Sequence, residues 1–245
     1  FSFACNCDCI RLCGGINQWF PKNTDNQIIN LWTAIEVAIP ITRKDSLSRI
    51  NQISNILTSA LGRDYFAGLV HQLFLDIAST GDELVKKIEG IDYEGSIEAK
   101  LLAILTLQDY NEVHDTLTRE LLNSMPILAC RMHGYKNKWS TTKSIKNAYQ
   151  AHSERLSQQI MRIYRTRNML VHDGTSMPYS DYVLQNLHYY IDSFIRFLST
   201  YYKLGYTSVN TMIDSIQFQE QMYLESLSVD ASVNKSNVEK YVLRV

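Results

Sequence analysis

The sequence lacks a long apolar run, because no stretch of about 18 consecutive apolar residues is present that would span a bilayer as a helix. The first residues also lack the basic start and apolar middle of a secretory signal peptide. These absences predict a cytoplasmic protein without a membrane segment. The chain begins with Phe1 and not with methionine, which is typical of a fragment whose upstream part, such as a sensor domain or the site of a regulatory partner, is missing.

An excess of either charge is also absent. The 245 residues include 24 basic and 25 acidic side chains, so the formal net charge is −1. Nucleic acids are bound chiefly through contacts between basic side chains and phosphates. Any contact of this protein with nucleic acid must therefore come from a local basic cluster. The hydrophobic share of 45% excludes a disordered chain and predicts a substantial core.

A second cysteine pair of the zinc-site type is missing from the start of the chain. Four of the five cysteines crowd together at Cys5, Cys7, Cys9 and Cys13. Structural zinc sites usually combine two pairs, each separated by two to four residues. From Phe1 to Cys9, apolar and cysteine residues instead alternate with polar ones, which is the period of a half-buried strand. We expect a short β segment with the cysteines as small buried hydrophobes; a metal site is the alternative.

From Thr24 onward the apolar spacing is helical. A first helix, capped by Asp25, runs to the residues before Pro40. The same spacing predicts four further helices, over roughly residues 45–60, 64–78, 96–106 and 109–122. The polar and basic segment 133–143 is expected to be a loop, either solvated or beside an anionic ligand.

Two long helices are predicted in the second half of the chain. The first has apolar residues at steps of three and four from Ile145 to Val171, and Gly174 is its expected left-handed stop. The second lies between Ser180 and Gly205 and carries a stripe with 3-4-3-4 spacing: Leu184, Leu187, Ile191, Phe194, Leu198 and Tyr201. Such a stripe indicates packing against other helices.

Four tyrosines of the second long helix allow two interpretations: Tyr189, Tyr190, Tyr201 and Tyr202. Aromatic residues at helical spacing are usually core or interface residues, and a base-stacking platform is the alternative. A last helix is predicted near residues 207–225. The remaining tail, residues 226–245, is expected to order only against a partner.

The first long helix ends in the stretch RIYRTRNMLVHDG, where Arg167 falls in phase with the apolar residues. A charge on an apolar face costs several kcal/mol unless it is paired or faces a cleft. The predicted partner of Arg167 is either Glu36, in the first-helix stretch LWTAIE, or an anionic ligand. Asn168 precedes His172 by four residues, so both lie on one helical face, where the amide can orient the imidazole.

An arginine and a histidine together suit the cleavage of RNA by its own 2′-hydroxyl. The reaction needs a base, an acid for the departing 5′-oxygen and a cation on the phosphorane. Histidine serves as acid or base near neutral pH, arginine binds phosphate oxygens, and no metal or cofactor is required. The carboxylate cluster of two-metal hydrolysis is missing, because Asp173 is the only acid between Glu154 and Asp181.

The same stretches resemble the motifs of the HEPN superfamily. RNMLVH fits the pattern of arginine, polar residue, three residues and histidine, and RIYRTRNMLVHDG is similar to the form in abortive-infection and Apea-like HEPN proteins. LWTAIE resembles the first-helix signature of that group. The resemblance implies an all-α, HEPN-like helical bundle over residues 24–225, after a cysteine-rich lead-in over 1–23. It also implies a homodimer in which two copies of the motif face each other.

The resemblance further implies a metal-independent endoribonuclease, acting as a toxin or anti-phage effector on RNA such as transfer RNA. Arg167 and His172 match the catalytic pair, Asn168 matches the polar residue, and Glu36 and Asp173 are supporting residues. Weaker RNA contacts are expected from four basic residues: Arg162, Arg165, Lys136 and Lys138.

Two alternatives to the enzyme remain. One is an inactive HEPN-like module for dimerisation or RNA binding, and the other is a structural bundle in which Arg167 only pairs with Glu36. Residues 45–140 exceed a minimal HEPN bundle and match no pattern of the family.

Overall fold

The computed structural model describes residues 24–40, 47–229 and 231–243, and this part of the chain is all-α. Its α-helices are α1 (Thr24–Ala38), α2 (Arg49–Gly62), α3 (Tyr65–Ala78), α4 (Asp82–Glu89), α5 (Ile97–Thr106), α6 (Asn111–Ser124), α7 (Pro126–Lys138), α8 (Thr142–His172), α9 (Ser180–Lys203) and α10 (Val209–Ser226). Two short helices of other types are η2 (Gln108–Tyr110) and η3 (Glu239–Leu243). No β-strand occurs in these residues, and the predicted β segment with its four cysteines lies outside them.

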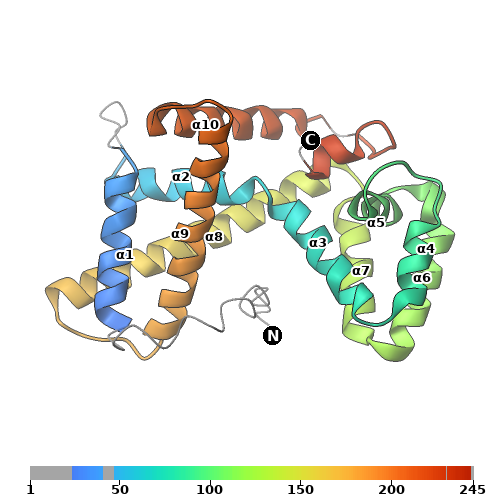
Figure 1. Cartoon of the computed structure of the whole chain (residues 1–245), viewed down its shortest axis with the longest axis horizontal. Coiled ribbons are helices and arrows are strands. Elements are labelled where there is room, and N and C mark those ends of the chain that lie inside the picture. Colours follow the sequence, from blue (N-terminus) through green and yellow to red (C-terminus); the bar gives the residue numbers. More distant parts are fainter. Residues whose placement is uncertain (1–23, 41–46, 230, 244–245) are drawn as a thin grey trace.

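The helices form two lobes that the long helix α8 joins (Figure 1). One hydrophobic core gathers α1, α2, the second half of α8, α9 and the first half of α10. The other core gathers α3 to α7, the start of α8 and the end of the chain. With 31 residues, α8 is about 46 Å long and contributes to both cores. In the described part of the chain, no helix is long and apolar enough to cross a membrane.

The four helices expected between residues 45 and 122 are confirmed as α2, α3, α5 and α6. Helix α4 was not predicted, although Leu84 and Ile88 bury one face of it at a four-residue step. The loop expected over residues 133–143 is wrong, because α7 continues to Lys138. Its buried face includes Met132, and Tyr135 stacks on Trp139 with ring centroids 4.6 Å apart; the polar residues fall largely on the outer face.

Residues 231–243, which follow α10, pack on the core formed by α3 to α7 and the start of α8. Val233, Val238 and Val242 are buried there. The Oγ1 atom of Thr142 donates to the carbonyl oxygen of Val229 at 2.6 Å, which ties the segment after α10 to the start of α8. The expectation that this tail orders only against a partner is therefore wrong.

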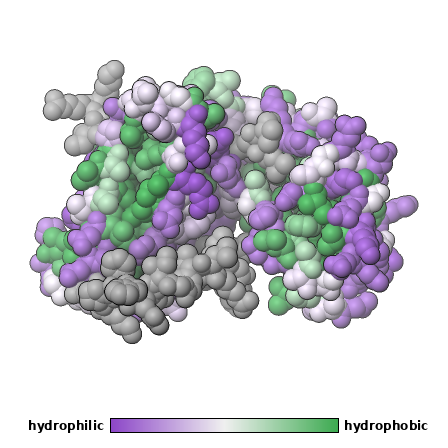
Figure 2. Space-filling model, viewed as in Figure 1, coloured by the Kyte–Doolittle hydropathy of each residue, from purple (hydrophilic) through white to green (hydrophobic). Residues whose placement is uncertain are grey.

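Helix α9 uses a different face than its apolar spacing predicted. Leu187, Phe194 and Tyr201 are buried as expected, and the face is completed by Val183, Tyr190 and Phe197. Leu184, Ile191 and Leu198 are only half-buried at its edge. Figure 2 shows apolar side chains gathered on the lobe that contains α1 and α9.

The four tyrosines of α9 divide into two pairs. Tyr190 and Tyr201 are core residues, and the Tyr201 hydroxyl donates to Oε1 of Gln219 at 2.7 Å. Tyr189 and Tyr202 are exposed. A platform of four tyrosines is therefore wrong, because half of them face the core.

Candidate functional site

Helix α1 packs on α8 through an aromatic contact that positions the predicted charged pair. Trp32 is buried, and its ring centroid lies 5.6 Å from that of Tyr164. Glu36 follows Trp32 by one helical turn, and Arg167 follows Tyr164 by three residues. The contact between the two rings therefore holds these charged side chains next to each other.

Arg167 pairs with Glu36, one of the two partners that the sequence left open. The Nη2 atom of Arg167 lies 3.6 Å from Oε2 of Glu36, and the two side chains are 22% and 29% exposed. Partial exposure leaves both charges accessible to water and lowers the cost of bringing them to this interface. Arg167 is thus held at the junction of α1 and α8 without being sealed inside the core.

The guanidinium of Arg167 has few partners for its five N–H groups. Its Nη1 atom donates to Oδ1 of Asn168 at 3.0 Å. Its Nε atom is buried and has no hydrogen-bond partner among the described residues. A buried donor without an acceptor is costly, so this N–H is an unsatisfied group of the contact between α1 and α8, and only the exposed part of the guanidinium is open to a ligand.

His172 is the last residue of α8, and its side chain is exposed. Gly174 follows with φ +60°, which confirms the predicted left-handed stop. Within the described residues, no hydrogen bond joins Asn168 to His172, and the Asn168 Oδ1 atom accepts from Arg167. The imidazole is therefore free to contact a ligand, and Asn168 positions the arginine instead.

One chain does not place Arg167 and His172 side by side. Five residues advance an α-helix by about 500°, so the two side chains leave α8 about 140° apart. Arg167 points to α1, whereas His172 points to solvent. The predicted catalytic pair shares the end of one helix but not one face of it.

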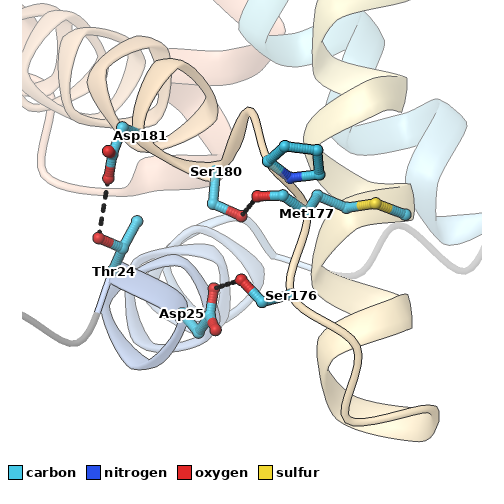
Figure 3. A pocket seen from close by; sticks show the side chains of 7 residues that line it. Thr24, Asp25, Ser176, Met177, Ser180 and Asp181 are labelled. Atoms are coloured by element: carbon cyan, nitrogen blue, oxygen red, sulfur yellow. Dashed lines mark hydrogen bonds between the residues drawn. The ribbon is translucent and has the colours of Figure 1, made fainter.

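A hollow of about 270 Å³ lies next to the loop that follows α8 (Figure 3). Its lining residues are Thr24, Asp25, Ser176, Met177, Pro178, Ser180 and Asp181. Thr24 Oγ1 donates to Asp181 Oδ1 at 2.9 Å, and Ser176 Oγ donates to Asp25 Oδ1 at 3.1 Å. The lining includes two carboxylates and no basic side chain, so it would repel a phosphate group. The hollow therefore marks a junction that fixes the end of α8 and is not the site for an RNA backbone.

Asp25 and Asp173 both lie near helix ends. Asp25 was predicted to cap α1, but it occupies the first turn and accepts the bond from Ser176. Asp173 is the residue after α8, and its backbone N–H donates to the carbonyl of Met169 at 2.9 Å. Its exposed carboxylate is adjacent to His172 in the chain.

The four basic residues expected to contact RNA fall into two separate places. Arg162 and Arg165 are exposed on α8, ten and seven residues before His172. Lys136 and Lys138 belong to α7 in the other lobe, and Arg162 lies about 30 Å along α8 from its first residue. Lys136 Nζ also lies 3.9 Å from Asp115 Oδ1. The structure therefore does not bring the two lysines to the candidate site.

Arg155 was missed by the sequence analysis. It is exposed on α8, and its spacing of seven residues from Arg162 was the signal that places both on one face. Arg155 also acts on a neighbouring histidine. Burial, with a smaller contribution from the charge of Arg155, lowers the pKa of His152 to about 4.

The described site thus consists of the half-exposed Arg167 and Glu36 pair, Asn168, and the exposed His172 on the same helix. In the part of the chain that the structure describes, no three His, Cys, Asp or Glu side chains are grouped to hold a metal ion. Neither a protein-family model, nor a curated protein, nor a solved structure matches this chain.

Proposed function

We propose that this protein is a metal-independent endoribonuclease. The observation that supports the proposal is the state of Arg167, a partly exposed guanidinium held by Glu36 and Asn168, five residues before an exposed histidine at the end of the same helix. The resemblance of these stretches to HEPN motifs points the same way. By that resemblance, we propose a toxin or anti-phage effector that acts on RNA such as transfer RNA.

The proposed reaction transfers the phosphate within the RNA strand. The 2′-oxygen forms a bond to phosphorus and gives its proton to a base, while the bond from phosphorus to the 5′-oxygen breaks and that oxygen receives a proton from an acid. The imidazole of His172 serves in proton transfer, and the Arg167 guanidinium stabilises the added negative charge of the phosphorane. The products are a 2′,3′-cyclic phosphate and a 5′-hydroxyl.

The proposed enzyme is a symmetric homodimer. One chain directs Arg167 and His172 to different sides of α8, and a single histidine is poorly suited to be base and acid in one step. A two-fold axis near the end of α8 would supply a second copy of each side chain. The two histidines then divide the proton transfers.

Two substitutions test the site: Arg167→Ala and His172→Ala. We expect each to lower RNA cleavage by at least about 100-fold, the usual contribution of one acid, base or charge-stabilising group. Arg131→Ala and His188→Ala are the matched controls. Arg131 is 26% exposed, pairs with Asp76 and has a buried Nε without a partner, and His188 is exposed on α9. Equal cleavage by all four variants would refute the assignment.

The product ends test the chemistry. A polynucleotide kinase should label the 5′ ends of the fragments without prior phosphatase treatment, and cleavage should persist with a chelator. A 2′-deoxy sugar at the cut site should prevent cleavage, because the nucleophile is then missing. Fragments with 5′-phosphates, or activity that depends on added magnesium, would overturn the proposal.

A binding module is the second candidate function. It is favoured by the pairing of Arg167 with Glu36 inside one chain, on the side of α8 away from His172. In that case the arginine stabilises the interface of α1 and α8, and the protein binds RNA without cutting it. RNA binding that His172→Ala leaves unchanged, with no cleavage by the parent protein, would identify this function.

A further inference from the structure

We propose that Arg155, Arg162 and Arg165 form a basic ridge on α8 that binds the phosphate backbone of single-stranded RNA and directs it to His172. This inference rests on the proposed ribonuclease function and names the path of its substrate. It differs from the sequence prediction, because it includes Arg155 and leaves out both lysines of α7.

The ridge is defined by the helical register of α8. Advancing about 100° per residue, the three arginines and His172 fall within an arc of about 100°. All four side chains are exposed. Arg155 and His172 are separated by 17 residues, or about 25 Å along the axis. A straight helix therefore presents the ridge as one continuous line that ends at the candidate acid or base.

The arginines of the ridge have no neutralising partners. Among the described residues, none of the three guanidinium groups forms an ion pair or a hydrogen bond, whereas those of Arg49, Arg131 and Arg167 are all engaged. The sequence from residue 155 to 172 contains no acid. Arg162 and Arg165 also stand three residues apart, where like charges repel by about 0.2 to 0.5 kcal/mol. A bound polyanion would relieve this repulsion.

Helix stability does not explain the ridge. The carbonyl end of a helix favours cations only within its last turn. Arg162 precedes the last residue of α8 by ten residues, and Arg155 by 17. Both lie too far from the end of α8 to benefit, so their charge remains available for a ligand.

The surroundings of the ridge favour nucleic acid over an acidic protein. Protein interfaces usually have an apolar centre, whereas nucleic-acid interfaces are polar and positively charged. Between residues 155 and 170 no large hydrophobic side chain of α8 is exposed, and exposed Gln158 lies between the first two arginines. This composition suits hydrogen bonds to phosphate and sugar oxygens.

The test is the salt dependence of RNA binding by the full chain. The probe is a single-stranded 20-mer with 2′-O-methyl sugars, which the proposed reaction cannot cleave. The variant carries Arg155→Gln, Arg162→Gln and Arg165→Gln together. The control carries Arg119→Gln, Lys138→Gln and Lys143→Gln together. All three residues are exposed and lie away from the ridge, on α6, at the end of α7 and in the first turn of α8.

Losing three phosphate contacts should lower the slope of log affinity against log salt by about 2, because each contact contributes about 0.7. Between about 50 and about 200 mM salt, the parent should then lose roughly 20-fold more affinity than the ridge variant. The control should keep the parent's slope. Equal slopes for parent and ridge variant, or the same loss in the control, would overturn the inference.

Two further readouts separate the possible causes of failure. If the ridge variant binds RNA normally but no longer binds phosphatidylserine vesicles that the parent binds, the ridge serves a lipid surface and the inference is wrong. If the ridge variant shows the predicted slope but the parent cuts no RNA, the ridge binds RNA and the ribonuclease proposal fails. If the parent cuts RNA and the ridge variant has the same KM and kcat, the ribonuclease proposal stands and the ridge inference fails.

Discussion

At the residue scale, Arg167 and Arg131 occupy similar environments in different lobes. Each guanidinium pairs with a carboxylate of another helix, with exposures of 22% and 26%, and each has a buried Nε without a described partner. Both pairs remain partly hydrated. We therefore expect each pair to contribute more to the free energy of unfolding than an exposed ion pair does, and less than a fully buried one.

We expect Arg167→Ala to lower the free energy of unfolding by about 1 to 2 kcal/mol, less than the roughly 3 to 5 kcal/mol for breaking a fully buried pair. Urea denaturation measures the change. Adding Glu36→Gln should recover part of it, because the carboxylate left behind is then neutral. A loss above about 3 kcal/mol would show that Arg167 is essential for the fold, and the activity test would then rely on His172.

We expect the free energy of unfolding to depend on pH through the protonation of His152. Its ring stacks on Tyr65 with centroids 3.7 Å apart. Burial, and to a lesser degree Arg155, lowers its pKa to about 4, whereas an unfolded histidine titrates near about 6.5. The unfolded chain therefore binds more protons between these values. This contribution to stability is complete above about pH 6.5 and declines as the pH falls toward 4.

The variant His152→Gln removes this titration. From about pH 7.5 to about pH 5, the parent should lose about 2 kcal/mol more stability than the variant, because the proton is taken up only by the unfolded parent. Urea titrations at both pH values measure the difference. Parallel losses in parent and variant would show that His152 is protonated as readily in the folded protein.

At the scale of elements, α2, α8 and α10 meet at a polar cluster. Glu220 accepts hydrogen bonds from the Tyr149 hydroxyl at 2.6 Å and from Ser59. Gly62 leaves room for that hydroxyl, since a Cβ atom there would lie 2.5 Å from it. The close approach of α2 and α8 therefore depends on the missing side chain.

We expect Gly62→Ala to lower the free energy of unfolding by about 1 to 3 kcal/mol, because the added methyl group displaces the buried Tyr149 ring. Gly68→Ala is the control. No atom lies within 4 Å of its added Cβ, and alanine is favoured over glycine in a helix by about 1 kcal/mol. Thermal or urea denaturation should show opposite signs for the two variants. A stabilised Gly62→Ala protein would mean that α2 and α8 are not in close contact there.

At the scale of the whole molecule, the proposed reaction requires two chains. The mass of one chain is 28.2 kDa, and we expect sedimentation to give twice this mass at micromolar concentration. A two-fold axis near the end of α8 would place two histidines near one phosphate, which would divide the acid and base roles. A monomer at that concentration, both with and without RNA, would contradict this prediction.

The sequence by itself determined the helical class and the main features of α1, α8 and α9. Helical periodicity and stop signals are local properties of a few neighbouring residues. For the same reason Gly174 was identified as the end of α8. Arg167 could also be recognised as a charge on an apolar stripe that needs a partner.

Only the tertiary structure decided which contacts satisfy these local patterns. In the folded chain Glu36 is the partner of Arg167, and the buried face of α9 includes Val183, Tyr190 and Phe197. Residues 231–243 also pack on the core of α3 to α8, and the lysines of α7 are separated from the arginines of α8. Spacing along one helix cannot reveal these outcomes, because they depend on the burial of apolar surface between segments that are far apart in the sequence.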